Sequence, residues 1–175
     1  MGQHQPGSIY HGLASLAESG ELVRHELRDG GREVAVYELS DLGRAEFRRL
    51  FEAAVTEVRP TAPLGFQTAM AMLPLVSRAD ALDLLGRRLE ALDRAASEAP
   101  EDRDVSDAPP HVHAMVDYWE RLARVERDWL LRLLFRIRDG ELAFLDEPMG
   151  WTPAPDDPGR QMNDDRERYL ALLGR

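Results

Sequence analysis

Residues 6–22 have the sequence PGSIYHGLASLAESGEL, which predicts a short amphipathic helix. Pro6 or Ser8 is a typical first residue of a helix, and Gly20 is a typical stop. Three apolar side chains recur at steps of four and three residues and so share one stripe: Ile9, Leu13 and Leu16. The polar side chains at the start of the helix lie mostly off that stripe: Ser8, Tyr10 and His11.

A hairpin and a second helix are expected directly after this helix. Residues 22–28 and 32–39 have the apolar and β-branched content of two strands, and the Asp-Gly-Gly between them tolerates positive φ in a tight turn. Ser40-Asp41 is a typical helix cap, and apolar residues recur over the next fourteen positions. Helix, hairpin and helix therefore form one compact unit.

Beyond residue 58 the sequence becomes helical. Residues 59–65 contain two Pro and one Gly and predict a linker. A short apolar segment follows at 66–73, and Ser77 caps a long helix with leucines at steps of three and four. Residues 99–110 are acidic and contain Pro, which is typical of a loop.

The longest predicted helix runs from about His111 to about Arg138, before a stop at Asp139-Gly140. Its apolar stripe is too broad for a helix that lies alone on a surface, so it indicates packing between helices or between two chains. An irregular arm at 147–159 and a terminal helix at 164–173 follow. The stripe consists of Met115, Trp119, Leu122, Trp129, Leu133 and Ile137.

A single carboxylate, Glu126, falls on this stripe between Leu122 and Trp129. A charge in apolar surroundings is costly unless it is paired, so we expect a cation such as Arg88 or Arg121 beside it. The favoured interpretation of the stripe is core and dimer seam, and the alternative is an effector pocket with Glu126 as a polar contact.

The N-terminal segment resembles the recognition helix of PadR-like transcriptional regulators. The shared pattern is a Pro-Gly start, a small hydroxyl residue, an apolar residue and Tyr, then spaced leucines and Gly-x-Leu. The resemblance continues through the wing, where Gly31-Arg32 precedes YELSDLGR at residues 37–44. Counterparts in the helical remainder are 73–75, Arg88-Leu89 and the stretch from Glu126 to Leu130.

This resemblance implies a mainly α fold with a small β-hairpin: a winged helix-turn-helix joined to a helical dimerisation domain. It implies a homodimeric repressor that binds double-stranded operator DNA and that a small aromatic or hydrophobic effector sometimes releases. The expected DNA contacts are Ser8, Tyr10, His11, Arg28 and Arg32. The expected effector or dimer seam is Met115, Trp119, Leu122, Glu126, Trp129 and Leu133.

The chain departs from the family pattern at its start. Family members carry two helices and a short strand before the recognition helix, whereas only five residues precede Pro6 here. We therefore expect a partial winged helix in residues 1–58, then the linker, a helical dimerisation and effector domain in 66–146 and a C-terminal arm in 147–175. A truncated paralogue that dimerises without binding DNA is the alternative.

Composition excludes several other classes. The 175 residues carry 32 acidic and 22 basic side chains, a net charge of -10, and every basic residue is Arg. Residues 1–50 hold 6 Arg and 8 acids, a net charge of -2, which argues against diffuse, charge-driven binding of nucleic acid. There is no Cys, which excludes disulfides and thiolate metal sites.

The remaining patterns favour a cytoplasmic protein that is not an enzyme. No apolar run approaches the roughly 20 residues of a membrane span, and the first six residues lack signal-peptide features. His111 and His113 with Asp117 and Glu120 form too generic a pattern to predict a metal site. No catalytic motif and no cofactor motif is present, so no catalytic residues, cofactor or metal are expected.

Overall fold

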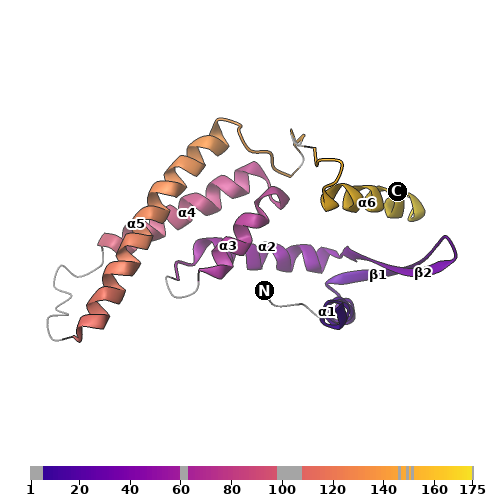
Figure 1. The fold of residues 1–175 in the computed structure, drawn as a ribbon, viewed down its shortest axis with the longest axis horizontal. Helices are drawn as coiled ribbons and strands as arrows, with labels where there is room; N and C mark the ends of the chain where they lie inside the picture. Colours follow the sequence, from indigo (N-terminus) through magenta and orange to yellow (C-terminus); the bar gives the residue numbers. More distant parts are fainter. Residues whose placement is uncertain are drawn as a thin grey trace. The chain divides into compact units, whose positions relative to one another are not determined.

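The computed structural model describes residues 6–59, 63–97, 108–145, 147–148, 150 and 152–174, with side chains from Ser8 onward. The structure is mainly helical with one antiparallel hairpin, which confirms that part of the predicted fold class (Figure 1). By its internal contacts the chain divides into two units, residues 1–50 with 151–175 and residues 51–150. Positions 60–62 of the predicted linker and 99–107 of the predicted loop lie outside the described residues.

The first unit begins with helix α1 (Pro6–Glu18), which ends where the sequence predicts, because Gly20 takes a φ of +89°. Strands β1 (Leu22–Asp29) and β2 (Arg32–Leu39) follow, and α1 packs against β1. The two residues between the strands, Gly30 and Gly31, have φ values of 55° and 85°. Positive φ at both central positions is the geometry of the tight hairpin turn that the sequence predicts.

The register of the hairpin assigns each side chain to a face. Leu22 lies opposite Leu39, and Asp29 lies opposite Arg32. Because side chains alternate along a strand and directly opposed residues share a face, Asp29 and Arg32 lie together on one face and Arg28 on the other. The face of Asp29 is the more shielded one, with half-buried side chains at His25, Leu27, Val34 and Val36.

Helix α2 (Asp41–Thr56) is joined tightly to the turn between α1 and β1. The hydroxyl of Ser40 accepts a hydrogen bond from the Gly43 N–H at 3.0 Å and donates one to the Gly20 carbonyl at 2.6 Å, which confirms the predicted cap. A Cβ at Gly43 would lie 2.1 Å from the carbonyl oxygen of Glu21. Only glycine therefore allows the first turn of α2 to approach this backbone.

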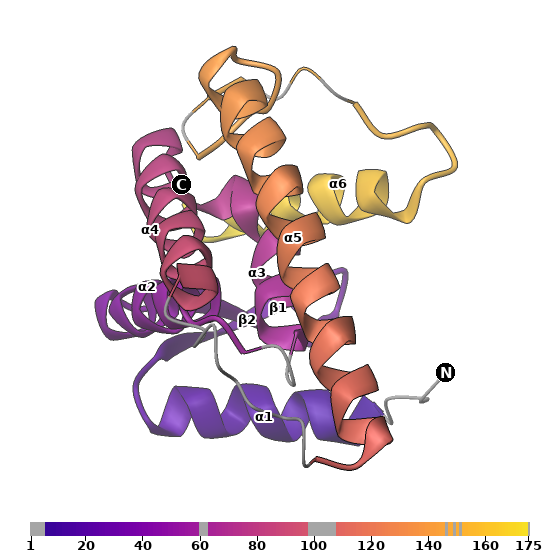
Figure 2. The ribbon, with the colours of Figure 1, turned by 90° about the vertical axis from the view of Figure 1, so that its left-hand side faces the viewer.

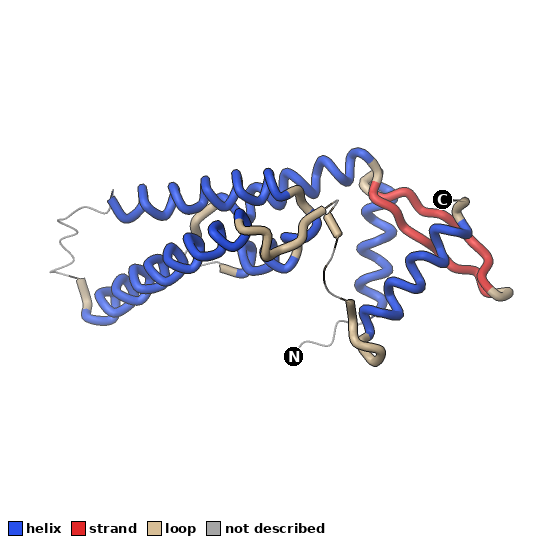
Figure 3. The backbone as a smooth tube through the Cα atoms, turned by 90° about the horizontal axis from the view of Figure 1, so that it is seen from above, coloured by secondary structure: helices blue, strands red, loops and turns tan. Residues whose placement is uncertain are grey.

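Helix α6 (Pro158–Leu172) also belongs to the first unit and starts at Pro158 rather than near Asp164. The carboxylate of Asp157 accepts a hydrogen bond from the Gly159 N–H at 2.7 Å, and Pro158 occupies the first helical position. Figures 1 and 3 draw α6 alongside the hairpin, where Arg168 pairs with Asp29. The sequence predicted a separate C-terminal arm. The structure shows instead that α6 is part of the first unit.

The second unit contains α3 (Leu64–Ala71), the short 3₁₀ helix η1 (Leu73–Leu75), α4 (Arg78–Ser97) and α5 (Pro110–Arg138). Figure 2 shows α4 and α5 side by side, and the predicted cap of α4 is confirmed by a 3.1 Å bond from the Asp80 N–H to the Ser77 hydroxyl. The core lies between the end of α2, α4 and the C-terminal half of α5. Its principal side chains are Phe51, Val55, Ala81, Leu84, Leu85, Leu92, Leu130, Leu133, Leu134 and Ile137.

The boundary between the units falls inside α2, after Leu50, rather than at residue 58 as predicted. The reason is that Phe51 and Val55 are buried and pack into the second core. A single continuous helix therefore belongs to both units, and no linker separates them at that point of the chain.

An arginine at the start of α4 fixes the segment that follows α5. Arg78 donates to both carboxylate oxygens of Glu147, at 2.8 and 2.6 Å, and to the carbonyls of Leu142 and Ile137. The hydrogen bond from Arg78, helped by one from the Phe144 N–H, holds the pKa of Glu147 below its ordinary value. These bonds satisfy carbonyls at and beyond the end of α5.

Candidate functional site

The predicted DNA-contact residues of α1 are all on the surface. Ser8, Tyr10 and His11 are exposed, with Tyr10 at 69%. Two residues of the apolar stripe, Ile9 and Leu16, are exposed as well, at 57% and 44%. Helix α1 therefore exposes apolar as well as polar side chains.

The two predicted hairpin contacts lie on opposite faces of the hairpin. Arg28 is 3.9 Å from Glu33, and both side chains are more than four-fifths exposed, so this pair contributes little to stability. Arg32 is exposed at the turn, and no carboxylate of the described residues lies within ion-pair distance of it. The structure therefore leaves Arg32 available to an anion but does not place Arg28 beside it.

Three further cations in this unit were missed by sequence reasoning. Arg44 and Arg48 are exposed one helical turn apart on α2, and neither forms an ion pair within the described part of the chain. Their spacing of four in a predicted helix was a signal that could have found them. Arg168 pairs with Asp29, 139 residues away, and no sequence pattern indicated that contact.

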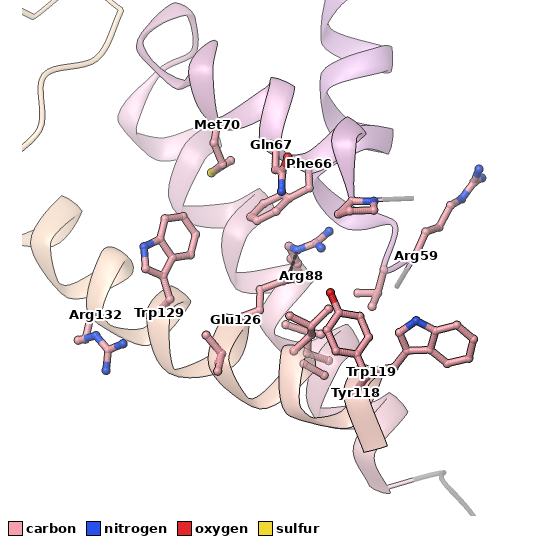
Figure 4. Close-up of a pocket in the computed structure, with 16 residues that line it drawn as sticks. Arg59, Phe66, Gln67, Met70, Arg88, Tyr118, Trp119, Glu126, Trp129 and Arg132 are labelled. Atoms are coloured by element: carbon pink, nitrogen blue, oxygen red, sulfur yellow. Dashed lines mark hydrogen bonds and ion pairs between the residues drawn. The ribbon is translucent and has the colours of Figure 1, made fainter. Parts of the chain in front are cut away.

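The second unit contains a pocket of about 610 Å³ beside α3 and α5 (Figure 4). Four of the six predicted seam residues line it, namely Trp119, Leu122, Glu126 and Trp129. Met115 is 47% exposed and is not part of the lining. The further lining residues are Val58, Arg59, Pro63, Phe66, Gln67, Met70, Arg88, Leu92, Tyr118, Ala123, Val125 and Arg132.

Leu133 corrects the predicted seam, because it lies in the core of this chain with 7% of its surface exposed. The stripe of α5 divides into two parts. Leu133 and Ile137 at its C-terminal end are buried in the second unit, whereas Met115, Leu122 and Trp129 before them are exposed. The exposed apolar side chains in the N-terminal half of α5 are Met115, Tyr118 and Leu122.

Glu126 is paired as expected, and its partner is Arg88. The Arg88 Nε donates to Glu126 Oε1 at 2.5 Å, while Nη1 donates to the carbonyls of Val55 and Glu57, both at 2.9 Å. The guanidinium is 3.7 Å from the centre of the Phe66 ring, and Arg88 as a whole is only 3% exposed. One side chain therefore joins the end of α2, α3, α4 and α5.

Arg121, the other predicted partner of Glu126, pairs instead with Asp117 one helical turn away, at 2.8 Å. The hydrogen bond from Arg121 holds the pKa of that carboxyl below its ordinary value. Both side chains are more than half exposed, so this is a surface pair.

Aromatic side chains give the pocket its chemical character. Phe66 and Trp129 meet edge to face, with ring centroids 6.2 Å apart and planes at 86°. Tyr118 and Trp119 also line the pocket and lie on α5, closer to its N-terminus than Trp129. The pocket is thus largely apolar and aromatic, with charged side chains such as Arg59 and Arg132 also in its lining, a combination that suits a small aromatic molecule with a polar group.

The histidines near the start of α5 do not form a metal site with other described residues. His113 Nε2 lies 3.0 Å from the Ala108 carbonyl, and the described residues contain no cluster of three His, Asp or Glu able to hold a metal ion. Within the same residues, no helix has both the length and the apolarity to cross a membrane.

No family model matches the chain, and no curated protein matches it.

Proposed function

We propose that this chain is a DNA-binding transcriptional regulator of the PadR-like type, a repressor that acts as a homodimer. One observation carries the proposal: α1, the hairpin and α2 follow in the order of a recognition helix and wing, with Ser8, Tyr10 and His11 exposed on the helix and Arg32 exposed at the turn. The resemblance of residues 6–44 to the family motif supports the same assignment.

The physical basis is groove recognition. An α-helix fits the major groove, where hydroxyl, phenol and imidazole groups such as those of Ser8, Tyr10 and His11 would read base edges. Arg32 would bind a phosphate or enter the minor groove beside the wing. Two such units in a dimer would read two half-sites of an operator.

The charge of residues 1–50 determines how this binding would depend on salt. Their net charge of -2 gives weak long-range attraction, so affinity would come from a few local phosphate contacts. The candidates for those contacts are the exposed arginines of residues 1–50 that have no carboxylate partner in the described chain: Arg32, Arg44 and Arg48.

Duplex binding measured against salt tests the proposal. We expect a duplex selected from a random pool to bind with a negative log–log salt slope, and Arg32→Ala to make the slope shallower by about 0.9 for each lost phosphate contact. Arg94→Ala, an exposed arginine of the second unit, is the matched control and should leave the slope unchanged. Absence of duplex binding at any salt concentration contradicts the proposal.

An interaction protein without DNA binding is the second candidate. The observation that favours it is the acidic balance of the first unit together with the exposed Ile9 and Leu16 on α1. In that case the apolar stripe of α1 would bind another protein, and the duplex experiment above would give no complex.

The homodimer in this proposal forms through the N-terminal half of α5, whose apolar side chains are exposed in the single chain. We expect light scattering at micromolar concentration to give the mass of a dimer, and Leu122→Glu to give that of a monomer, because burial of an unpaired carboxylate is costly. Arg124→Glu, on the opposite side of α5, is the control and should remain dimeric. A monomeric mass for the unmodified chain would exclude the dimer. The aromatic pocket, which Leu122 also lines, is the proposed effector site.

A further inference from the structure

The C-terminal helix contributes a cation to the tip of the hairpin. Arg168 of α6 forms an ion pair with Asp29, the last residue of β1. The exposures of the two side chains differ: Asp29 is 16% exposed and Arg168 is 54% exposed. The guanidinium therefore shields the carboxylate and remains open to solvent itself.

This pair changes the charge beside Arg32. Asp29 and Arg32 are directly opposed in the hairpin register and share a face, so an unshielded Asp29 would cancel the attraction of Arg32 for a phosphate. With Arg168 over Asp29, the three side chains carry a net positive charge at the turn. The acidic residue next to the proposed wing contact is thus neutralised by a residue from the other end of the chain.

One face of helix α6 packs against the rest of the first unit. The side chains at 165, 169 and 173 are half-buried at steps of four, while most of their neighbours are exposed. Among the described residues, Arg168–Asp29 is the one ion pair between α6 and the hairpin. Because the guanidinium of Arg168 is 54% exposed, the pair places positive charge where solvent or a ligand can reach it.

We infer that Arg168 is a further nucleic-acid contact of this protein, and that with Arg32 it forms a two-arginine tip on the hairpin that binds duplex phosphates. The inference rests on the proposed function. It adds the C-terminal helix to the DNA-binding surface, and it explains how a hairpin with four acids and three arginines presents positive charge at its turn.

The test compares four forms of the full chain for binding to the selected duplex by fluorescence anisotropy. Arg168→Ala should weaken binding about 5- to 10-fold at low salt and make the log–log salt slope shallower by about 0.9. Arg166→Ala is the matched control, an exposed arginine of the same helix without an ion pair in the described chain, and should bind within about 2-fold of the unmodified protein. The double variant Asp29→Asn with Arg168→Ala should regain part of the affinity, because the repelling carboxylate is gone, but keep the shallower slope, because the phosphate contact of Arg168 is still missing.

Three results separate the possible failures. If the unmodified chain binds and Arg168→Ala binds as Arg166→Ala does, the inference is overturned and the proposed function stands. If Arg168→Ala and the double variant are equally weak but keep the salt slope of the unmodified protein, no phosphate contact has been lost and the weakening comes from detachment of α6, which also overturns it. If the unmodified chain binds no duplex, the proposed function fails and the assignment of Arg168 fails with it.

Discussion

Replacing Gly43 by alanine is expected to destabilise the first unit by about 3 kcal/mol or more, as severe overpacking does. The added Cβ would lie 2.1 Å from the carbonyl oxygen of Glu21, 2.9 Å from its carbonyl carbon and 3.1 Å from a methyl of Leu39. The first two are backbone atoms, which cannot rotate away. Either the first turn of α2 or the turn before β1 must move, and the bonds of Ser40 to both would be lost.

Urea denaturation followed by circular dichroism measures this effect. The control is Gly12→Ala, because Gly12 lies inside α1 of the same unit and a Cβ there meets no atom within 4 Å. Alanine in a helix interior is expected to stabilise by about 0.5–1 kcal/mol relative to glycine. Equal midpoints for Gly43→Ala and the unmodified chain would show that α2 and the Glu21 backbone do not approach each other as described.

Replacing Arg88 by alanine is expected to destabilise the second unit by about 3–5 kcal/mol, the usual cost of removing one partner of a buried ion pair. Glu126 would lose its partner, the carbonyls of Val55 and Glu57 would lose a donor, and a cavity would open under the ring of Phe66. The cost of the unsatisfied polar groups and the cost of the cavity add, because the Arg88 side chain both donates these hydrogen bonds and fills the space under the ring.

Two variants make the second prediction specific. Arg87→Ala removes a neighbouring arginine whose pair with Glu52 lies on the surface, and its denaturation midpoint should stay close to that of the unmodified protein. Arg88→Lys keeps the charge but cannot reach Glu126 and both carbonyls at once, so its midpoint should fall between those of the other two. A midpoint for Arg88→Ala equal to that for Arg87→Ala would mean that the four-element junction does not hold this unit together.

Local structure was predictable because its signals are local. The caps at Ser40 and Ser77, the glycine turn at 30–31 and the end of α1 before Gly20 each depend on residues a few positions apart. The same kind of signal was present but overlooked at Asp157-Pro158, which starts α6. An acid followed by proline is a typical helix start, so this boundary could have been predicted.

The arrangement of elements depended on contacts that periodicity does not encode. The pairing of Arg168 with Asp29 joins the two ends of the chain, and the division within α2 follows from which core buries Phe51. The spacing of the α5 stripe predicted an apolar face, but not which part of that face is buried. For that reason Leu133 was assigned to the seam although it belongs to the core.

The candidate site was predicted unevenly for the same reason. Glu126 called for a partner because a charge on an apolar stripe must be paired, and Arg88 was one of two arginines proposed. The two carbonyls and the aromatic ring that Arg88 also contacts come from segments far away in sequence, so only the structure could supply them. Arg28 and Arg32 were both expected to contact DNA, and the strand register places them on opposite faces of the hairpin.

The measurement that tests the central claim most directly is the ratio of affinities for a selected duplex and a scrambled one of equal length. The account predicts a ratio of about 10³ or more for the unmodified chain, falling to near 1 for Tyr10→Ala with His11→Ala while scrambled-duplex binding persists, because base readout would be lost and phosphate contacts kept. A chain that selects no duplex, or a double variant that keeps the full ratio, would contradict the assignment of α1 as a recognition helix.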